Sequence, residues 1–201
     1  MKISKTIHNI RAKFFAAQIL LALEYLHSKD ILYRDLKPEN VLIDADGYIR
    51  ITDFGLAKTG VSENNAKTIC GTPEYFPPEI LMRKQYGKPM DWWTFGAILF
   101  EMVSGLPPFY SNDKKVSFEK ILYTKLAYPN YFSQDLQSLL SGLFIKDPSK
   151  RLGSSGTVEI KNHPWFSNVN WTALLNKEFR APFIPIIKSE LDLNNFSTVL
   201  R

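Results

Sequence analysis

The sequence has little that could hold a fold together other than a hydrophobic core. Its single cysteine, Cys70, excludes a framework of disulfide bonds and suits a reducing compartment, the cytosol or the nucleus. Its three histidines lack the spacing of a zinc site, so no zinc centre is predicted. With 45% hydrophobic residues in a chain of 201, the protein can bury one sizeable core.

Long apolar runs and concentrated charge are also missing. The longest apolar run, residues 95–103, is about half of the ~20 residues that a membrane-spanning helix needs, and no signal peptide is visible. The net charge is +5, but the basic residues are scattered and are not interleaved with aromatic ones. We therefore expect neither a membrane nor a nucleic acid as a partner, and we expect a cytoplasmic or nuclear location.

Two short polar motifs are the most informative part of the sequence. They place an aspartate, a lysine and an asparagine close together, with a further aspartate before a glycine shortly afterwards. The motifs read Tyr33-Arg34-Asp35-Leu36-Lys37-Pro38-Glu39-Asn40 and Asp53-Phe54-Gly55. These residue types at these spacings indicate a phosphoryl-transfer site.

Each of these side chains has a chemical role to offer. Asp35 could take the proton of an attacking hydroxyl, and Lys37 could place a positive charge on the phosphoryl group. Asn40 and Asp53 offer the oxygen ligands that Mg²⁺ combines with phosphates and water. Residues 41–44 and 48–52 read as two strands around an Asp-Gly turn. Such a hairpin would return Asp53 to the neighbourhood of Asn40.

The rest of the chain reads as mainly helical. Residues 11–28 carry apolar side chains on one face, as an amphipathic helix does. Residues 91–104 are apolar on every side, which predicts a buried helix at the centre of the fold. Residues 59–67 are polar without periodicity and are predicted to form a mobile loop. Further helices are predicted over residues 116–124, 133–144 and 157–162.

Further motifs give the whole chain a family resemblance. It resembles the C-terminal lobe of a protein kinase of the AGC class, and within that class it is most similar to the cAMP-dependent protein kinases. Besides the two polar motifs, the residues that carry the resemblance are Gly47-Tyr48-Ile49, Leu56-Ala57-Lys58, Thr68-Ile69-Cys70-Gly71-Thr72-Pro73-Glu74-Tyr75, Asp91-Trp92-Trp93, Asp147-Pro148-Ser149-Lys150-Arg151-Leu152-Gly153, His163-Pro164-Trp165-Phe166 and Ala181-Pro182-Phe183-Ile184-Pro185.

The resemblance implies a fold and a division of the chain. The fold would be the large lobe of a protein kinase, mainly α-helical with a small antiparallel hairpin between the catalytic and metal-binding loops. Residues 1–166 would form this lobe, with the catalytic loop at 33–40, the metal-binding loop at 53–55 and the activation segment at 53–79. Residues 167–201 would be a truncated tail of the AGC type.

The resemblance also implies the cofactors and the residues around the reaction. ATP and Mg²⁺ would be held by Lys37, Glu39, Asn40 and Asp53, with Asn40 and Asp53 on the metal. Thr72 would hydrogen-bond between Asp35 and Lys37 and complete the catalytic set. Thr68 would be the phosphorylated threonine of the activation segment; the alternative is an ordinary loop threonine. Its phosphate would pair with Arg34 and Lys58.

Three other residues gain structural roles. Glu79 would form a buried ion pair with Arg151 that fixes the activation segment to the helical base. Asp91 would steady the backbone of the catalytic loop, although capping of its own helix explains it almost equally well.

Substrate preference follows from the same comparison. Lys37 together with residues 71–72 is typical of kinases that act on serine and threonine. Three glutamates match positions that receive arginines upstream of the target residue, since carboxylates bind guanidinium groups bidentately. Three apolar residues match the pocket for the residue after the target. The glutamates are Glu39, Glu74 and Glu101, and the apolar residues are Ile69, Pro73 and Phe76.

Some features of a complete kinase are not found in the sequence. No glycine-rich phosphate loop precedes the catalytic loop, and no strand lysine with a glutamate partner is present. We therefore expect the small lobe to be missing and the isolated chain to bind Mg-ATP weakly and to transfer phosphate poorly or not at all. Lys67 replaces a tryptophan that helps the relatives hold a cAMP-binding regulatory subunit, which argues against that partner.

Two hypotheses remain open at this point. The chain is either the catalytic lobe of a serine/threonine kinase or a naturally truncated lobe that binds substrates or regulatory subunits without turnover. The intact set of Asp35, Lys37, Asn40 and Asp53 favours the kinase.

Overall fold

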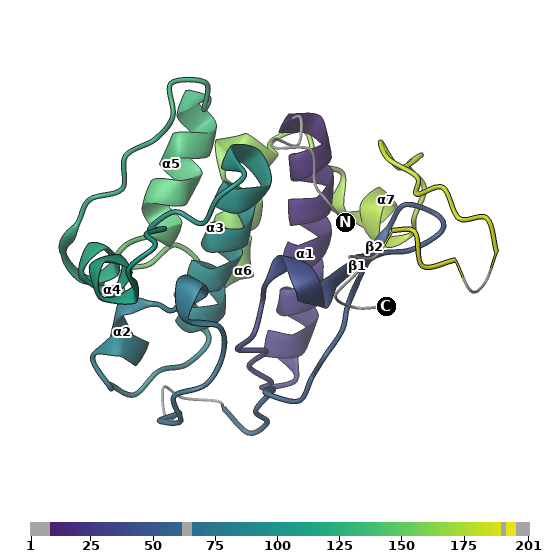
Figure 1. Ribbon diagram of the computed structural model, residues 1–201. Helices are drawn as coiled ribbons and strands as arrows, with labels where there is room; N and C mark the ends of the chain where they lie inside the picture. The colour runs from purple at the N-terminus through teal and green to yellow at the C-terminus, as the bar shows by residue number, and fades with distance from the viewer. Residues whose placement is uncertain (1–8, 62–65, 190–191, 196–201) are drawn as a thin grey trace.

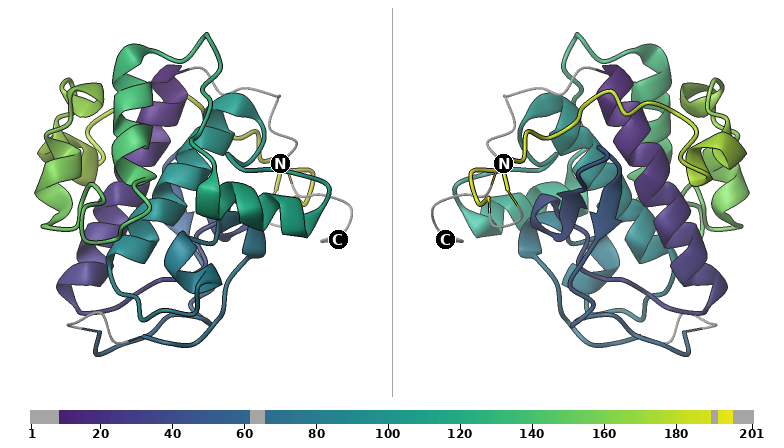
Figure 2. Two further views of the ribbon diagram at one scale, coloured as in Figure 1. Left: turned by 90° about the vertical axis from the view of Figure 1, so that its left-hand side faces the viewer. Right: turned by 90° about the vertical axis from the view of Figure 1, so that its right-hand side faces the viewer.

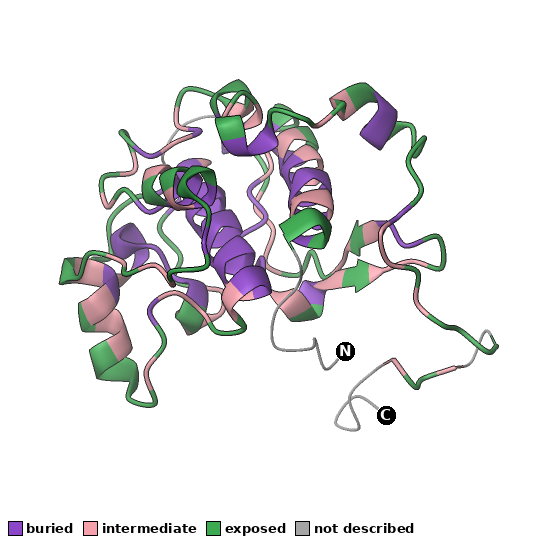
Figure 3. Ribbon diagram, turned by 90° about the horizontal axis from the view of Figure 1, so that it is seen from above, coloured by how far each residue is buried: buried purple, intermediate pink, exposed green. Residues whose placement is uncertain are grey.

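Helix α3 (Pro89–Ser104) lies at the centre of the fold, with nearly all of its residues buried (Figure 3). This confirms the buried helix predicted from its apolar sequence. Gly105, in the left-handed conformation at φ +85°, ends the helix. The computed structural model describes residues 9–61, 66–189 and 192–195 of the chain.

Helix α1 (Asn9–Ser28) runs beside α3 and buries one face against it (Figures 1 and 2). The side chains of Phe15 and Ile19, which belong to the predicted apolar stripe, lie in the core. Because α1 packs on α3, the segment that follows α1 starts from a fixed point. That segment contains the predicted catalytic loop, residues 33–40.

Two short strands follow the catalytic loop on the other side of α1 from α3. Strands β1 (Val41–Ile43) and β2 (Ile49–Ile51) pair antiparallel in the register Leu42 opposite Arg50. Gly47 takes φ +81° in the turn between them, a conformation that costs glycine little. The predicted fold class, mainly helical with a small antiparallel hairpin, is confirmed.

The remaining elements surround this centre. Helices α4, α5 and α6 match predicted ones to within two residues at each end, whereas α2, α7 and the three 3₁₀ turns were not predicted because they are too short to show periodicity. The bounds are η1 Pro38–Asn40, η2 Pro73–Tyr75, α2 Pro78–Leu81, α4 Lys114–Tyr123, α5 Gln134–Leu143, α6 Thr157–Lys161, η3 Pro164–Phe166 and α7 Trp171–Leu175.

The segment after α7 returns to the hairpin. The hydroxyl of Tyr48 donates to the Phe179 carbonyl oxygen at 2.8 Å, and Lys177 pairs with Asp46 at 2.6 Å. The carbonyl of Phe183 lies so close to Gly47 that a Cβ there would be 2.2 Å from its oxygen. These contacts hold the hairpin from the outside, opposite α1.

The predicted polar loop is anchored at both ends. The Val61 amide donates to the Asp30 carbonyl at 3.1 Å, and Ala66 pairs through its main chain with Tyr86. The middle of this loop, residues 62–65, lies outside the described residues. No helix in the described ranges has the length and apolar character needed to cross a membrane.

Candidate functional site

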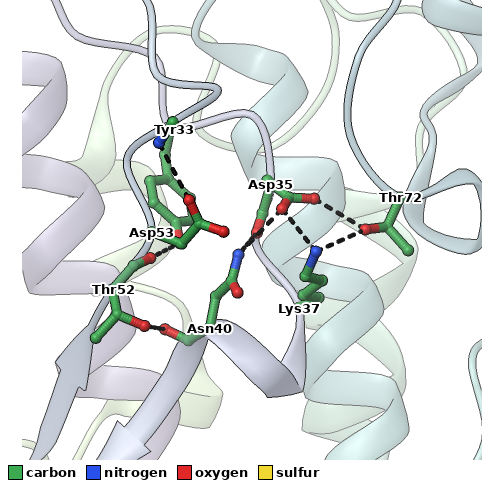
Figure 4. Close-up of polar contacts among 8 residues, drawn as sticks. Tyr33, Asp35, Lys37, Asn40, Thr52, Asp53 and Thr72 are labelled. Atoms are coloured by element: carbon green, nitrogen blue, oxygen red, sulfur yellow. Dashed lines mark hydrogen bonds and ion pairs between the residues drawn. The ribbon is translucent and has the colours of Figure 1, made fainter. Parts of the chain in front are cut away.

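The catalytic loop collects its polar side chains around Asp35 (Figure 4). Lys37 Nζ lies 2.7 Å from Asp35 Oδ2, and Thr72 Oγ1 donates to Asp35 Oδ1 at 2.9 Å. Lys37 Nζ also donates to Thr72 Oγ1 at 3.3 Å. The bridge that was predicted for Thr72 between Asp35 and Lys37 is thus present. Although Asp35 is only 5% exposed, its carboxylate is surrounded by polar groups.

Asn40 joins the same group from the start of the hairpin. Its Nδ2 donates to the Asp35 carbonyl oxygen at 2.9 Å and to Asp35 Oδ2 at 3.1 Å. Because the amide nitrogen is engaged in these hydrogen bonds, Oδ1 is the side-chain atom that could bind a metal ion. The orientation of Asn40 therefore suits the metal-binding role that was predicted for it.

The hairpin brings Asp53 back to Asn40. Thr52, the residue before Asp53, donates from its backbone amide to the Asn40 carbonyl oxygen at 2.9 Å. Asp53 takes φ +58°, and its carboxylate points toward the Asn40 and Asp35 side chains (Figure 4). The Gly55 amide donates to Asp53 Oδ1 at 3.2 Å. Two stretches that are separate in the sequence thus supply one site.

The pKa of the Tyr33 hydroxyl shows that the charges of Asp35 and Asp53 lie in one neighbourhood. Burial, the largest cause, raises the pKa of this hydroxyl; the hydrogen bond from Asn40 lowers it, and the charges of Asp35 and Asp53 raise it further. The hydroxyl also donates to the carbonyl oxygen of Thr52. Tyr33 therefore lies beside Asn40 and Asp53, the predicted metal-binding pair.

Asp91 supports the catalytic loop from α3. Its Oδ2 accepts the Tyr33 amide at 3.0 Å, and its Oδ1 accepts the Arg34 amide at 3.0 Å. The alternative role as a helix cap is wrong: α3 begins two residues earlier at Pro89, and its N-terminus has no side-chain cap. Arg34 takes φ +70°, so the two bonds from Asp91 fix an unusual turn of the backbone.

Acidic side chains gather beside the catalytic loop. The Tyr75 hydroxyl donates to Glu101 Oε2 at 2.5 Å, and the charges of Glu101, Glu39 and Glu74 all raise the pKa of Tyr75, after the larger effect of its burial. Glu39 and Glu74 are exposed, and Glu101 is half-buried. The three glutamates thus lie in one neighbourhood, around the hydroxyl of Tyr75.

The half-buried carboxyl of Glu101 allows a test through pH. Burial, the largest cause, raises its pKa; the Tyr75 hydrogen bond lowers it, and Glu39 raises it. Because the folded chain then binds more protons than the unfolded chain, the parent protein loses stability as the pH rises from about 4.5 through the raised value. We expect Glu101→Gln to increase the free energy of unfolding at pH 7, with a gain that shrinks toward pH 4.5.

Urea unfolding of the parent and the variant at several pH values between 4.5 and 7 would measure this gain. Glu119→Gln removes an exposed glutamate from α4 and serves as the control. A loss of stability at pH 7 in Glu101→Gln would contradict the prediction.

The three apolar residues that were predicted to form a pocket differ in their exposure. Ile69 is 52% exposed and Pro73 is half-buried, so both present surface to a ligand. Phe76 is only 8% exposed and belongs to a small core cluster with Leu32 and Ile80. Phe76 can form the floor of such a pocket, whereas Ile69 offers most of the open surface.

The predicted phosphate partners of Thr68 are placed as follows. Arg34 is buried and donates from Nε to the Leu56 carbonyl oxygen at 2.6 Å. Thr68 is exposed, and its carbonyl oxygen is linked to Arg34 through one intervening hydroxyl, that of Tyr86. Lys58 pairs through its main chain with Leu32, two residues before Arg34. Arg34 thus lies within the catalytic loop, and Lys58 lies on the segment that pairs with the residue just before it.

The predicted pair of Glu79 and Arg151 is present and deeply buried. The Arg151 Nη1 and Nη2 atoms donate to the two Glu79 oxygens at 2.7 and 2.9 Å, and Nη1 also donates to the Pro89 carbonyl oxygen at 2.8 Å. The guanidinium group stacks over the Trp93 ring at 5.1 Å. The pair thus ties the end of the activation segment to α3.

Two buried polar residues near the site were missed in the sequence. Gln18 accepts the Ile49 amide at 2.9 Å, which fixes β2 against α1. His27 contacts Asp91 Oδ2 through Nε2 at 2.8 Å. Gln18 could have been found, because it interrupts the apolar face of the predicted helix; nothing in the sequence distinguished His27.

The donor set decides which metal could fit. Within the described ranges there is no cluster of three histidine, cysteine, aspartate or glutamate side chains. Asn40 and Asp53 supply two oxygen ligands, which is what Mg²⁺ takes from a protein when phosphates and water complete its shell. The residues present therefore fit magnesium bound together with a phosphate ligand.

Comparison with known proteins agrees with this geometry. The protein kinase domain model matches residues 1–166. Serine/threonine-protein kinase YPK2/YKR2 of Saccharomyces cerevisiae is 49% identical over 187 residues, 92% of this chain and 28% of the relative. Serine/threonine-protein kinase sgk-1 of Caenorhabditis elegans is 48% identical over 93% of this chain and 41% of the relative.

A cAMP-dependent kinase is equally similar. cAMP-dependent protein kinase type 3 of S. cerevisiae is 48% identical over 92% of this chain and 46% of the relative. These identities do not separate the cAMP-dependent kinases from other kinases of the AGC class. The chain spans less than half the length of each of these three relatives. The match over residues 1–166, together with these relatives, shows that the chain belongs to the protein kinase family.

Proposed function

We propose that this chain carries the phosphoryl-transfer site of a serine/threonine protein kinase that uses ATP and Mg²⁺. The observation that supports this most strongly is the convergence of Asp35, Lys37 and Asn40 with Asp53. A lobe that only bound other proteins would not require this arrangement. The proposal therefore favours catalysis over a purely docking role.

The residues divide the work as follows. Asp35 accepts the proton of the serine or threonine hydroxyl while that oxygen bonds to phosphorus and the bond from the γ-phosphorus to the bridging oxygen breaks. Lys37 places its charge on the phosphoryl group that is transferred. Thr72 holds the Asp35 carboxylate and the Lys37 ammonium group in place through hydrogen bonds to both. Bound Mg²⁺ would neutralise phosphate charge, with Asn40 and Asp53 as its protein ligands and Glu39 at the rim of the nucleotide site.

Substrates are proposed to carry arginines before the target residue. Glu39, Glu74 and Glu101 would bind the guanidinium groups, since their combined charge favours cations. Ile69, Pro73 and Phe76 would contact an apolar residue after the target. A cAMP-binding regulatory subunit is not part of this proposal, because Lys67 departs from the pattern.

Regulation and location are proposed on the same basis. Phosphorylation of Thr68 would add roughly −1.5 to −2 charge near the buried cation of Arg34 and near Lys58. The described part of the chain gives Arg34 no acidic partner within salt-bridge distance, so a phosphate would be its first anion.

A cytoplasmic or nuclear location is proposed from the low cysteine content.

Metal binding offers a test that does not depend on turnover. With Mn²⁺ and ATP added, we expect the paramagnetic ion to broaden the amide NMR signals of Asn40, Val41, Asp53 and Phe54, and EDTA to restore them. Asp53→Asn should abolish the broadening by removing a charged ligand. Asp44→Asn, an exposed acid in the same hairpin that pairs with Arg50, should leave it unchanged. Broadening that persists in Asp53→Asn would contradict the proposed metal site.

A further inference from the structure

Tyr86 connects three segments that are separate in the sequence. It lies between α2 and α3 and is 2% exposed. Its hydroxyl oxygen accepts a hydrogen bond from Arg34 Nη1 at 3.1 Å, and the hydroxyl donates to the Thr68 carbonyl oxygen at 2.6 Å. Its main chain exchanges two hydrogen bonds with Ala66, at 3.1 and 3.0 Å. One residue thus links the activation segment to the catalytic loop.

The chain of contacts reaches the catalytic carboxylate from two directions. Arg34 precedes Asp35, and its backbone is fixed by Asp91. Thr68 lies four residues before Thr72, which donates to Asp35. Only residues 69–71 separate the two threonines, so we expect a shift of the segment at Thr68 to alter the Thr72–Asp35 hydrogen bond.

We propose that Tyr86 is a positioning residue: its hydroxyl ties the activation segment to Arg34 and so holds Thr72 against Asp35. The contact uses the main-chain carbonyl of Thr68, so it does not require a phosphate on the Thr68 side chain. The proposal rests on the proposed function, because that function makes Asp35 and Thr72 catalytic residues. The tether itself depends only on the contacts of Tyr86.

A consequence distinguishes this role from simple packing. Arg34 has one guanidinium group to offer, and a phosphate on Thr68 would bind it more strongly than a neutral hydroxyl does. With the phosphate in place, Arg34 holds the segment directly and the Tyr86 hydroxyl becomes dispensable. The ring of Tyr86, which packs with Leu32 and Met90, is needed in both forms.

Hydrogen exchange at the Ala66 amide, followed by NMR, tests the proposal. Four proteins are compared: the parent chain and Tyr86→Phe, each with Thr68 unmodified or incorporated as phosphothreonine. In the unmodified chain we expect Tyr86→Phe to speed exchange about tenfold, because a hydrogen bond to a charged group is lost. In the phosphothreonine form we expect less than a twofold change.

Two controls keep the result specific. The Leu99 amide in α3 should exchange at the same rate in all four proteins, which excludes global destabilisation. Tyr128→Phe, which removes a hydroxyl bonded to Ser141 at 2.8 Å, should leave Ala66 unaffected. An unchanged Ala66 rate in unmodified Tyr86→Phe would overturn the tether, and an equal increase in both forms would overturn the role of Arg34. Since no readout uses phosphate transfer, an inactive chain would count only against the proposed function.

Discussion

Phosphoryl transfer to an arginine-containing peptide is expected to fall by about 10² to 10⁴ when Asp35 is replaced by asparagine, which is the usual contribution of a general base. Asparagine fills nearly the same space, but its single side-chain oxygen can replace only one of the two Asp35 oxygens, which accept from Lys37 and from Thr72, and it cannot take the proton of the attacking hydroxyl. The loss should therefore appear in kcat, while KM for ATP changes little.

Radiometric assay of the protein in the full length that its gene encodes would measure this loss. Asp44→Asn is a suitable control, since Asp44 is an acid of the same hairpin whose partner is Arg50. Transfer by Asp35→Asn within tenfold of the parent rate would contradict the assignment of Asp35 as the base.

The largest expected effect on stability comes from breaking the pair between Glu79 and Arg151. Glu79→Ala should lower the free energy of unfolding by about 3–5 kcal/mol, because it leaves the Arg151 guanidinium buried without its counter-charge. Both side chains are almost wholly buried, at 1% and 0% exposure, so water cannot replace the lost carboxylate. Urea unfolding at pH 7 would measure the difference.

A matched surface pair shows how much of this effect is due to burial. Lys150 lies 3.9 Å from Asp147 with both side chains open to solvent, and Lys150→Ala should cost less than about 1 kcal/mol. A cost below about 1 kcal/mol for Glu79→Ala as well would show that the guanidinium is satisfied by the carbonyl oxygens of Pro89 and Ile145 alone.

Together these predictions separate chemistry from architecture. Asp35→Asn keeps the size of the side chain and one of its two acceptor oxygens, and should change the rate without unfolding the chain. Glu79→Ala removes no group from the site and should change stability first. Glu101→Gln concerns both chemistry and architecture, since the carboxyl that it removes is half-buried and belongs to the proposed substrate site.

The sequence by itself determined the main elements and the chemistry of the site. An apolar composition on all sides identified α3, and the two polar motifs with the Asp-Gly turn between them predicted a hairpin that returns Asp53 to Asn40. These features could be predicted because hydrophobic periodicity and turn chemistry act over a few neighbouring residues.

Only the tertiary structure decided which distant residues meet. The contact of His27 with Asp91, the hydroxyl of Tyr86 between Arg34 and Thr68, and the packing of Phe76 in one cluster with Leu32 all join residues far apart in the chain. Such contacts depend on how helices pack rather than on local propensity. A polar residue within a helix or a connecting loop gives no sign in the sequence of the partner that packing will bring to it.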